Sequence, residues 1–192
     1  MRLNLPVLLG SVRRDRMGIR AAYFVMRALE ERGHAPTLVD AMELQLPLLD
    51  RMYKEHPKGE APENLEKLAA LYRSADGFII VSGEYNHGIQ PGMKNLLDYF
   101  LEEYFWRPSG IVSYSQGAFG GVRAAMQLRM TLAELGMSSV PSLMPIPSIQ
   151  TALSEDGVPA DARLTKSMAR FLGEFEWYAR ALKAERAKGV PR

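Results

Sequence analysis

The chain has 192 residues, of which 47% are apolar, 24% charged and 9% aromatic, with a formal net charge of +2. This composition predicts one globular domain over residues 1–192, and the small net charge argues against a nucleic-acid partner. The sequence contains no cysteine, which excludes disulfides, thiolate metal ligands and cysteine nucleophiles, so redox chemistry would need a cofactor. Without a signal-peptide pattern or an apolar run near the roughly 20 residues of a membrane span, we expect a cytoplasmic protein that does not bind membranes.

The first half of the chain alternates short apolar runs with amphipathic segments. Residues 5–9 form an apolar run, and the apolar positions that follow at helical spacing predict a helix that stops near Gly33. Residues 35–39 predict a second strand, and a polar, proline-containing segment then leads to a helix over 63–73. Residues 77–82 are continuously apolar and rich in β-branched side chains, a pattern typical of a strand buried on both faces of a parallel sheet. This run is the predicted central strand.

The same alternation continues in the second half. Proline at the first turn predicts a helix over 91–101, and residues 109–114 predict a fourth strand. A helix over 125–135 follows, and the fifth strand, 140–146, contains prolines, which favour an edge position in the sheet. An apolar stripe over 164–182 predicts a last helix that packs across the sheet.

Five strands that alternate with helices predict an α/β three-layer sandwich with an open, five-stranded parallel sheet. Right-handed crossovers leave few strand arrangements, and the flavodoxin-like order 2-1-3-4-5 is favoured among them. The carboxyl ends of parallel strands meet at one edge, where such folds bind ligands. The loops after the first, third and fourth strands are therefore expected to lie together.

The loop after the first strand has the features of a phosphate site. Gly10 permits a sharp turn, Ser11 offers a hydroxyl, and Arg13 and Arg16 offer planar cations before a helix that begins near Met17. The N-terminus of that helix presents unpaired N–H groups and the positive end of its dipole. The glycine patterns of dinucleotide-binding and nucleotide phosphate loops are both absent. An ordinary strand-to-helix turn with solvated arginines is the alternative.

The loop after the third strand offers hydrogen bonds to the edge of a heterocycle. Its residues are Gly83, Glu84, Tyr85, Asn86, His87 and Gly88. The side chains supply carboxylate, phenol and amide groups, and the two glycines allow close backbone approach; a polar turn is the alternative. Because the histidines are not clustered with acidic residues at metal-ligand spacing, no metal site is expected. His34 and His56 are expected at the surface.

The loop after the fourth strand is rich in glycine. Its Ser115, Gly117, Gly120 and Gly121 bring backbone close to a flat ligand, and Gln116 and Phe119 can line the same space. A plain glycine-rich turn before a helix is the alternative for this segment as well.

Together these segments resemble the NAD(P)H-dependent FMN reductases of flavodoxin-like fold, which include flavin, quinone, azo-compound and chromate reductases. The resemblance covers residues 5–182. Its specific parts are Gly10-Ser11-Val12-Arg13, Glu84-Tyr85-Asn86 followed by Lys94-Asn95-Leu96-Leu97-Asp98, and Ser115 with Gly117, Gly120 and Gly121. The family usually has proline before the Glu-Tyr-Asn triplet, whereas this chain has Gly83, which predicts a looser turn.

The resemblance implies that bound FMN carries the chemistry and that no side chain is catalytic. The first loop would hold the FMN phosphate and ribityl chain, and the other two would surround the isoalloxazine. The implied cofactor-binding residues are Ser11, Arg13, Arg16, Met17, Gly18, Glu84, Tyr85, Asn86, His87, Gly88, Ser115, Gly117 and Gly120. NADPH or NADH would donate a hydride, and a flavin, quinone, azo compound or metal oxyanion would accept the electrons. The resemblance also implies a homodimer or homotetramer. A flavodoxin-like electron carrier and a non-flavin phosphate- or nucleotide-binding domain are the alternatives.

Overall fold

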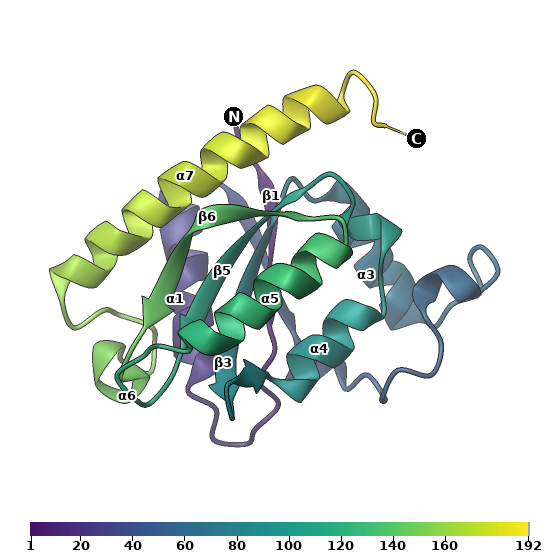
Figure 1. Ribbon diagram of the computed structural model, residues 1–192. Helices are drawn as coiled ribbons and strands as arrows, with labels where there is room; N and C mark the ends of the chain where they lie inside the picture. Colours follow the sequence, from purple (N-terminus) through teal and green to yellow (C-terminus); the bar gives the residue numbers. More distant parts are fainter. Residues whose placement is uncertain (192) are drawn as a thin grey trace.

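The computed structural model describes residues 1–191 and has a parallel sheet between two layers of helices (Figure 1). The parallel strands lie in the order β2-β1-β3-β5-β6. They are β1 (Asn4–Leu9), β2 (Ala35–Asp40), β3 (Phe78–Tyr85), β5 (Pro108–Tyr114) and β6 (Ser138–Ile146). A sixth strand, β4 (Gly88–Ile89), folds back antiparallel onto the end of β3 and is too short to be predicted from its pattern. The predicted order of the five parallel strands is confirmed.

Helices cover both faces of the sheet. On one face lie α1 (Gly18–Glu31) and α7 (Ala162–Arg186), and on the other lie α3 (Glu63–Ser74), α4 (Pro91–Asp98) and α5 (Val122–Glu134). Short helical turns, α2 (Ala41–Leu44), α6 (Ile149–Ala152), Tyr53–Glu55 and Glu102–Tyr104, complete the described elements. The helix that begins at Pro91 ends earlier than predicted, because Phe100 and Tyr104 turn into the core beside Tyr72.

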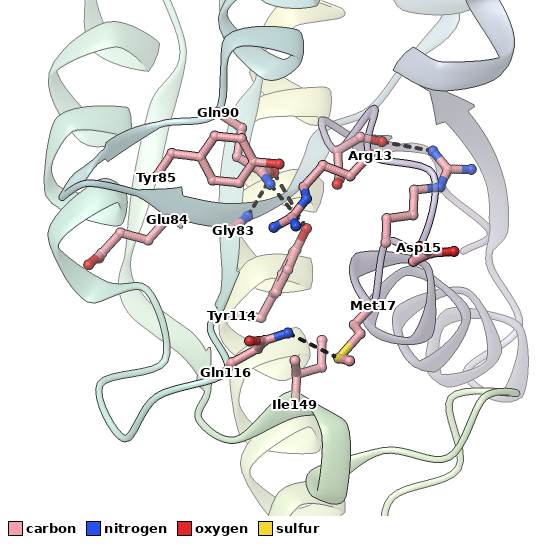
Figure 2. A pocket seen from close by; sticks show the side chains of 12 residues that line it. Arg13, Asp15, Met17, Gly83, Glu84, Tyr85, Gln90, Tyr114, Gln116 and Ile149 are labelled. Atoms are coloured by element: carbon pink, nitrogen blue, oxygen red, sulfur yellow. Dashed lines mark hydrogen bonds between the residues drawn. The ribbon is translucent and has the colours of Figure 1, made fainter.

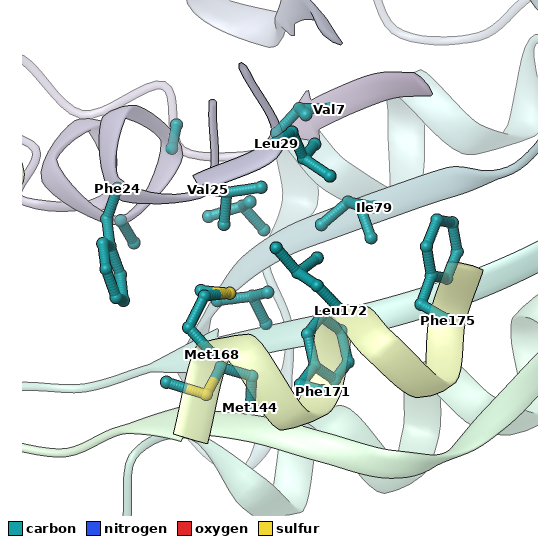
Figure 3. Packing of buried hydrophobic residues seen from close by; sticks show 14 of the residues in the cluster. Val7, Phe24, Val25, Leu29, Ile79, Met144, Met168, Phe171, Leu172 and Phe175 are labelled. Carbon is teal, nitrogen blue, oxygen red and sulfur yellow. The ribbon is translucent and has the colours of Figure 1, made fainter. Parts of the chain in front are cut away.

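The central strands contribute side chains to two hydrophobic cores, one on each face of the sheet. On β3, Ile79 and Val81 pack toward α1 and α7, and Phe78 and Ile80 pack toward α3, α4 and α5. Figure 3 shows the first of these cores, in which Phe171 and neighbouring side chains of α7 lie over the sheet. Each fully buried aliphatic or aromatic side chain contributes about 1.5–3 kcal/mol to folding. The continuously apolar character of β3 follows from this two-sided burial.

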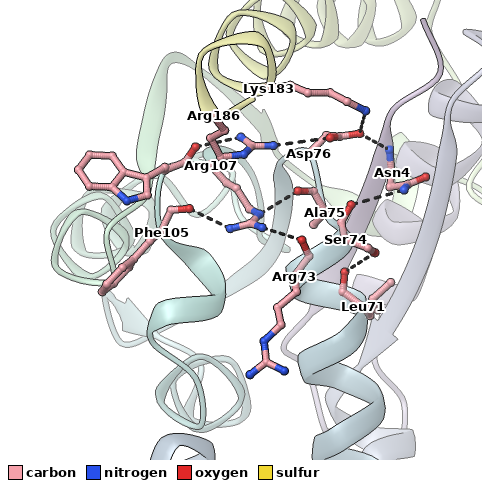
Figure 4. Close-up of polar contacts among 11 residues, drawn as sticks. Asn4, Leu71, Arg73, Ser74, Ala75, Asp76, Phe105, Arg107, Lys183 and Arg186 are labelled. Atoms are coloured by element: carbon pink, nitrogen blue, oxygen red, sulfur yellow. Dashed lines mark hydrogen bonds and ion pairs between the residues drawn. The ribbon is translucent and has the colours of Figure 1, made fainter. Parts of the chain in front are cut away.

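An ion cluster fixes the end of α7 at the amino edge of the sheet, opposite the carboxyl ends of the strands (Figure 4). The buried carboxylate of Asp76 accepts the backbone N–H of Asn4 at 3.0 Å and lies 2.9 Å from Lys183 Nζ and 3.6 Å from Arg186. Nearby, burial and the charge of Arg186 lower the pKa of Arg107 to about 10. Arg107 therefore stays ionised at neutral pH while it donates to the carbonyl of Ala75 at 2.8 Å.

The expectation that His34 lies at the surface is wrong. The imidazole is buried where β2 begins, because α7 passes over it. Its Nδ1 accepts the backbone N–H of Leu3 at 3.3 Å, and its Nε2 lies 3.0 Å from Glu176 Oε1 of α7. Glu176 also receives a hydrogen bond from Arg32 at the end of α1. His34 is thus part of a structural contact between the first and last helices.

Candidate functional site

A pocket opens at the carboxyl edge of the sheet, among the first loop and the ends of β3 and β5 (Figure 2). It is lined by Ser11, Arg13, Asp15, Arg16, Met17, Gly83, Glu84, Tyr85, Gln90, Tyr114, Gln116 and Ile149. Of the residues implied by the sequence, Ser11, Arg13, Arg16, Met17, Glu84 and Tyr85 line this pocket. The lining does not include Gly18, Asn86, His87, Gly88, Ser115, Gly117 or Gly120. Cofactor binding by any of these residues stays a prediction.

The first loop carries a cation that lines the pocket and is free of ion pairs. Arg13 is exposed, and in the described chain, residues 1–191, its guanidinium has no carboxylate partner. Ser11 is buried beside it, and α1 begins at Gly18 without any side-chain cap on its first turn. Uncapped N–H groups together with the helix dipole favour an anion at this position.

The other arginine of the loop that lines the pocket is already paired. Arg16 forms a bidentate ion pair with the buried carboxylate of Asp40, and it donates to the carbonyl of Ser11 at 2.8 Å. Asp40 also accepts the backbone N–H of Met42 at 3.0 Å, where α2 begins. Arg16 thus holds the first loop against the end of β2, and the charge of Asp40 offsets its own.

Asn86 and His87 form the turn between β3 and β4. Both have positive φ, 50° and 66°, as the two central residues of a tight hairpin require, and asparagine tolerates this conformation well. Their side chains are exposed, and the carbonyl of His87 accepts a hydrogen bond from Gln127 at 3.1 Å. These two residues therefore shape the hairpin at the edge of the pocket.

The carboxylate of Glu84 points to the N-terminus of α5 and away from the centre of the pocket (Figure 2). Its Oε2 accepts the backbone N–H groups of Arg123 at 3.0 Å and Ala124 at 3.2 Å. The residue that precedes α5, Gly121, has a φ of 76° and offers no side-chain cap, so Glu84 supplies the missing acceptor. This contact ties β3 to α5.

The third loop reaches the pocket mainly through Gln116. Its amide lies 3.8 Å from the sulfur of Met17, so the first and third loops meet. Ser115 and Gly117 instead accept backbone N–H groups from Ile149 and Ser148 through their carbonyls, at 3.1 Å each. These bonds bring the side chain of Ile149 into the pocket wall.

Sequence reasoning missed two buried residues at the pocket floor, Gln90 and Tyr114. Gln90 Oε1 accepts the N–H of Gly83 at 2.9 Å, which fixes the hairpin where a looser turn was predicted. The ring of Tyr114 fills the space beside Gly83, since a Cβ there would lie 3.0 Å from it. Each residue had one weak signal in the sequence. Tyr114 is a polar group at the end of an apolar strand, and Gln90 directly precedes Pro91, where a helix begins.

The pocket and the surrounding chain lack two other features. Within residues 1–191, no three histidine, cysteine, aspartate or glutamate side chains gather as a metal site requires. The same part of the chain contains no helix with the length and apolar character needed to cross a bilayer.

Comparison with known proteins gives consistent relatives. The family model of NADPH-dependent FMN reductases matches residues 3–151. The chain is 31% identical over 144 residues to the NAD(P)H-dependent FMN reductase ntnL of Nectria sp., and the alignment covers 67% of each chain. It is 30% identical over 141 residues to the quinone reductase of Escherichia coli K12, and this alignment covers 70% of this chain and 71% of the relative.

Solved structures agree on the fold. The flavoenzyme FerB of Paracoccus denitrificans, an NAD(P)H:acceptor oxidoreductase, superposes with a TM-score of 0.73. The match covers 93% of this chain and 98% of FerB at 21% identity. A likeness at this identity supports the flavodoxin-like architecture of the sheet and its two helical layers.

Proposed function

The chain belongs to the family of NADPH-dependent FMN reductases, and on that premise we propose that it passes electrons from NAD(P)H to a quinone in the pocket at the carboxyl edge of the sheet. The protein is an NAD(P)H-dependent oxidoreductase with FMN as its cofactor. The choice of a quinone rests on the quinone reductases among its relatives at 30% identity. Flavins, azo compounds and metal oxyanions are the other acceptors to compare.

The observation that carries the proposal is an anion site beside unpaired polar groups in one pocket. The uncapped first turn of α1 and the free guanidinium of Arg13 suit a phosphate. The hydroxyl of Tyr85 is buried and has no hydrogen-bond partner within residues 1–191, so a polar ligand atom would satisfy it. Gln116 adds an exposed amide to the pocket wall. These residues fit a phosphorylated heterocycle such as FMN.

Bound FMN supplies the redox chemistry, since it accepts a hydride from a nicotinamide and delivers electrons to a second substrate. The chain's own residues bind and orient. Arg13 and the N-terminus of α1 hold the phosphate end, while Tyr85, Gln116 and the backbone at Gly83 border the rest of the pocket. We expect NAD(P)H and the quinone to occupy the same pocket, so one must leave before the other binds. This order predicts ping-pong kinetics.

We also propose that the protein is a cytoplasmic homodimer, or a homotetramer built from such dimers. The exposed side of α5 and the loop before it supports this, because Phe119, Met126 and Met130 are 63%, 46% and 70% exposed there. NAD(P)H as the electron donor suits a cytoplasmic location. Size-exclusion chromatography with light scattering measures the subunit number, and a monomer at micromolar concentration would contradict it.

The function is tested with purified protein under anaerobic conditions. We expect flavin absorption bands that bleach on addition of NADPH or NADH and return on addition of a quinone such as benzoquinone. Riboflavin, an azo dye and chromate, tested in parallel, rank the acceptors. Bands that bleach only over hours would favour an electron carrier, and protein that stays colourless after incubation with FMN would favour a non-flavin phosphate-binding domain.

A further inference from the structure

The phenol of Tyr114 extends across the floor of the pocket from the sheet to the first turn of α1 (Figure 2). Its ring lies against Gly83 of β3, and its hydroxyl lies where a side chain on Gly18 would begin, 2.1 Å from the ideal Cβ position. Both glycines therefore make room for this one side chain. The hydroxyl is thereby held at the N-terminus of α1, the end of the pocket that attracts an anion.

The hydroxyl of Tyr114 has only long hydrogen bonds to Gln90. The Tyr114 hydroxyl lies 3.4 Å from both Gln90 Oε1 and Gln90 Nε2, so it can donate to the amide oxygen or accept from the amide nitrogen. Both contacts are long, and Gln90 Oε1 also accepts the N–H of Gly83 at 2.9 Å, so a phosphate oxygen can replace Gln90 as the acceptor of the phenol. A phenol oxygen that accepts from Gln90 can donate its own proton to a ligand. Burial raises the pKa of Tyr114, although hydrogen bonds with Gln90 and Ser11 oppose this, so the phenol keeps its proton at neutral pH.

The residues around the Tyr114 hydroxyl also include cationic groups that suit a phosphate. Ser11, Arg13 and Arg16 line the same end of the pocket. Of the two arginines, Arg16 is neutralised by Asp40, so a doubly charged phosphate would meet one free guanidinium and the helix N-terminus. A further neutral donor beneath the phosphate adds binding energy without the cost of burying another cation.

We propose that the hydroxyl of Tyr114 donates a hydrogen bond to the phosphate of FMN. This contact makes the pocket bind FMN in preference to riboflavin. The proposal builds on the FMN site described above and assigns a specificity role to a residue outside its sequence motifs. Riboflavin has the same isoalloxazine and ribityl chain but no phosphate, so its affinity reports binding without any of the phosphate contacts, that of Tyr114 included.

The test compares flavin affinities of the full-length chain, prepared free of flavin, by isothermal titration with FMN and with riboflavin. We expect Tyr114→Phe to raise the Kd for FMN by about tenfold or more, the usual effect of losing a hydrogen bond to a charged group. The Kd for riboflavin should stay the same, so the ratio of the two Kd values falls. The matched control is Tyr104→Phe, which removes another buried phenol hydroxyl, far from the pocket in the core beside Tyr72 and Phe78.

Each outcome decides the proposal. An unchanged FMN affinity in Tyr114→Phe would overturn it, and so would an equal loss for both flavins, because that result means that Tyr114 only shapes the pocket. An equal change of the Kd ratio in Tyr104→Phe would overturn it as well. If the unmodified chain binds neither flavin, the FMN site itself is refuted, and this result is distinct from a failure confined to Tyr114.

Discussion

At the scale of single residues, the two arginines of the first loop that line the pocket have different tasks. Arg13 is free to meet a phosphate, whereas Arg16 is held by Asp40 and the carbonyl of Ser11. We expect Arg13→Gln to weaken FMN binding about 10- to 100-fold, because a charge-assisted hydrogen bond is worth about 1.5–3 kcal/mol. The thermal stability of the flavin-free protein should not change, since Arg13 is exposed. Flavin titration and thermal denaturation measure the two effects.

Arg16→Gln is the matched comparison and should behave in the opposite way. It leaves the buried carboxylate of Asp40 unpaired, which costs about 3 kcal/mol or more of unfolding free energy. The double variant Arg16→Gln with Asp40→Asn should recover part of that loss, because no charge then remains buried. If Arg16→Gln weakens FMN binding as strongly as Arg13→Gln without lowering stability, this division of tasks is wrong.

The sequence places Arg13 and Arg16 in the same loop but does not predict which of the two is held in an ion pair. Asp40 lies 24 residues after Arg16 and reaches it only because β1 and β2 run parallel, with Leu9 opposite Asp40. Gln90 and Tyr114 were missed for the same reason, because their contacts arise from strand register and close packing. Residue type and local spacing contain no information on such distant pairs.

At the scale of secondary-structure elements, Glu84 joins β3 to α5. Its carboxylate accepts the N–H groups of Arg123 and Ala124 at the start of the helix, where Gly121 offers no cap. We expect Glu84→Ala to lower the unfolding free energy by about 1–2 kcal/mol, the usual cost of losing an N-cap. Chemical denaturation of the flavin-free protein measures this change.

Glu84→Gln separates the capping role from a direct role toward the cofactor. Its amide oxygen can still accept one backbone N–H, so we expect about half of the loss seen in Glu84→Ala and a similar FMN affinity. A Glu84→Ala protein of unchanged stability that no longer binds FMN would show that the carboxylate contacts the ligand instead.

Regular elements were the most predictable part of the chain, because periodic apolar residues and a first-turn proline specify them locally. The parallel strands and the main helices follow from these patterns. The short elements β4 and α6 have two and four residues, too few for any period to show. The end of α4 was misjudged because the aromatic residues after Asp98 belong to the core through tertiary packing and leave the helical path.

At the scale of the whole molecule, Glu176 joins the last helix to the first strand-helix-strand unit. Burial raises the pKa of this carboxyl group, but hydrogen bonds from Arg32 and His34, together with the charge of Arg32, outweigh burial and leave the pKa below its ordinary value of 4.5. The folded protein therefore binds this proton less readily than the unfolded chain does. The stabilisation is complete well above pH 4.5 and is lost as pH falls through the lowered pKa.

Glu176→Gln tests this contribution to acid stability. At pH 7 the variant should be less stable by about 2 kcal/mol, the value of a hydrogen bond to a charged group. The difference from the unmodified protein should shrink as pH falls from 4.5, the ordinary carboxyl value, through the lowered pKa of the folded state, because Glu176 then takes up a proton and becomes neutral like glutamine. Urea denaturation between pH 7 and pH 3 measures the difference. Glu185→Gln, on the exposed face of the same helix beside Lys188, is the control and should change stability little. A Glu176→Gln deficit that stays constant across this pH range would show that packing, and not ionisation, links α7 to the rest of the molecule.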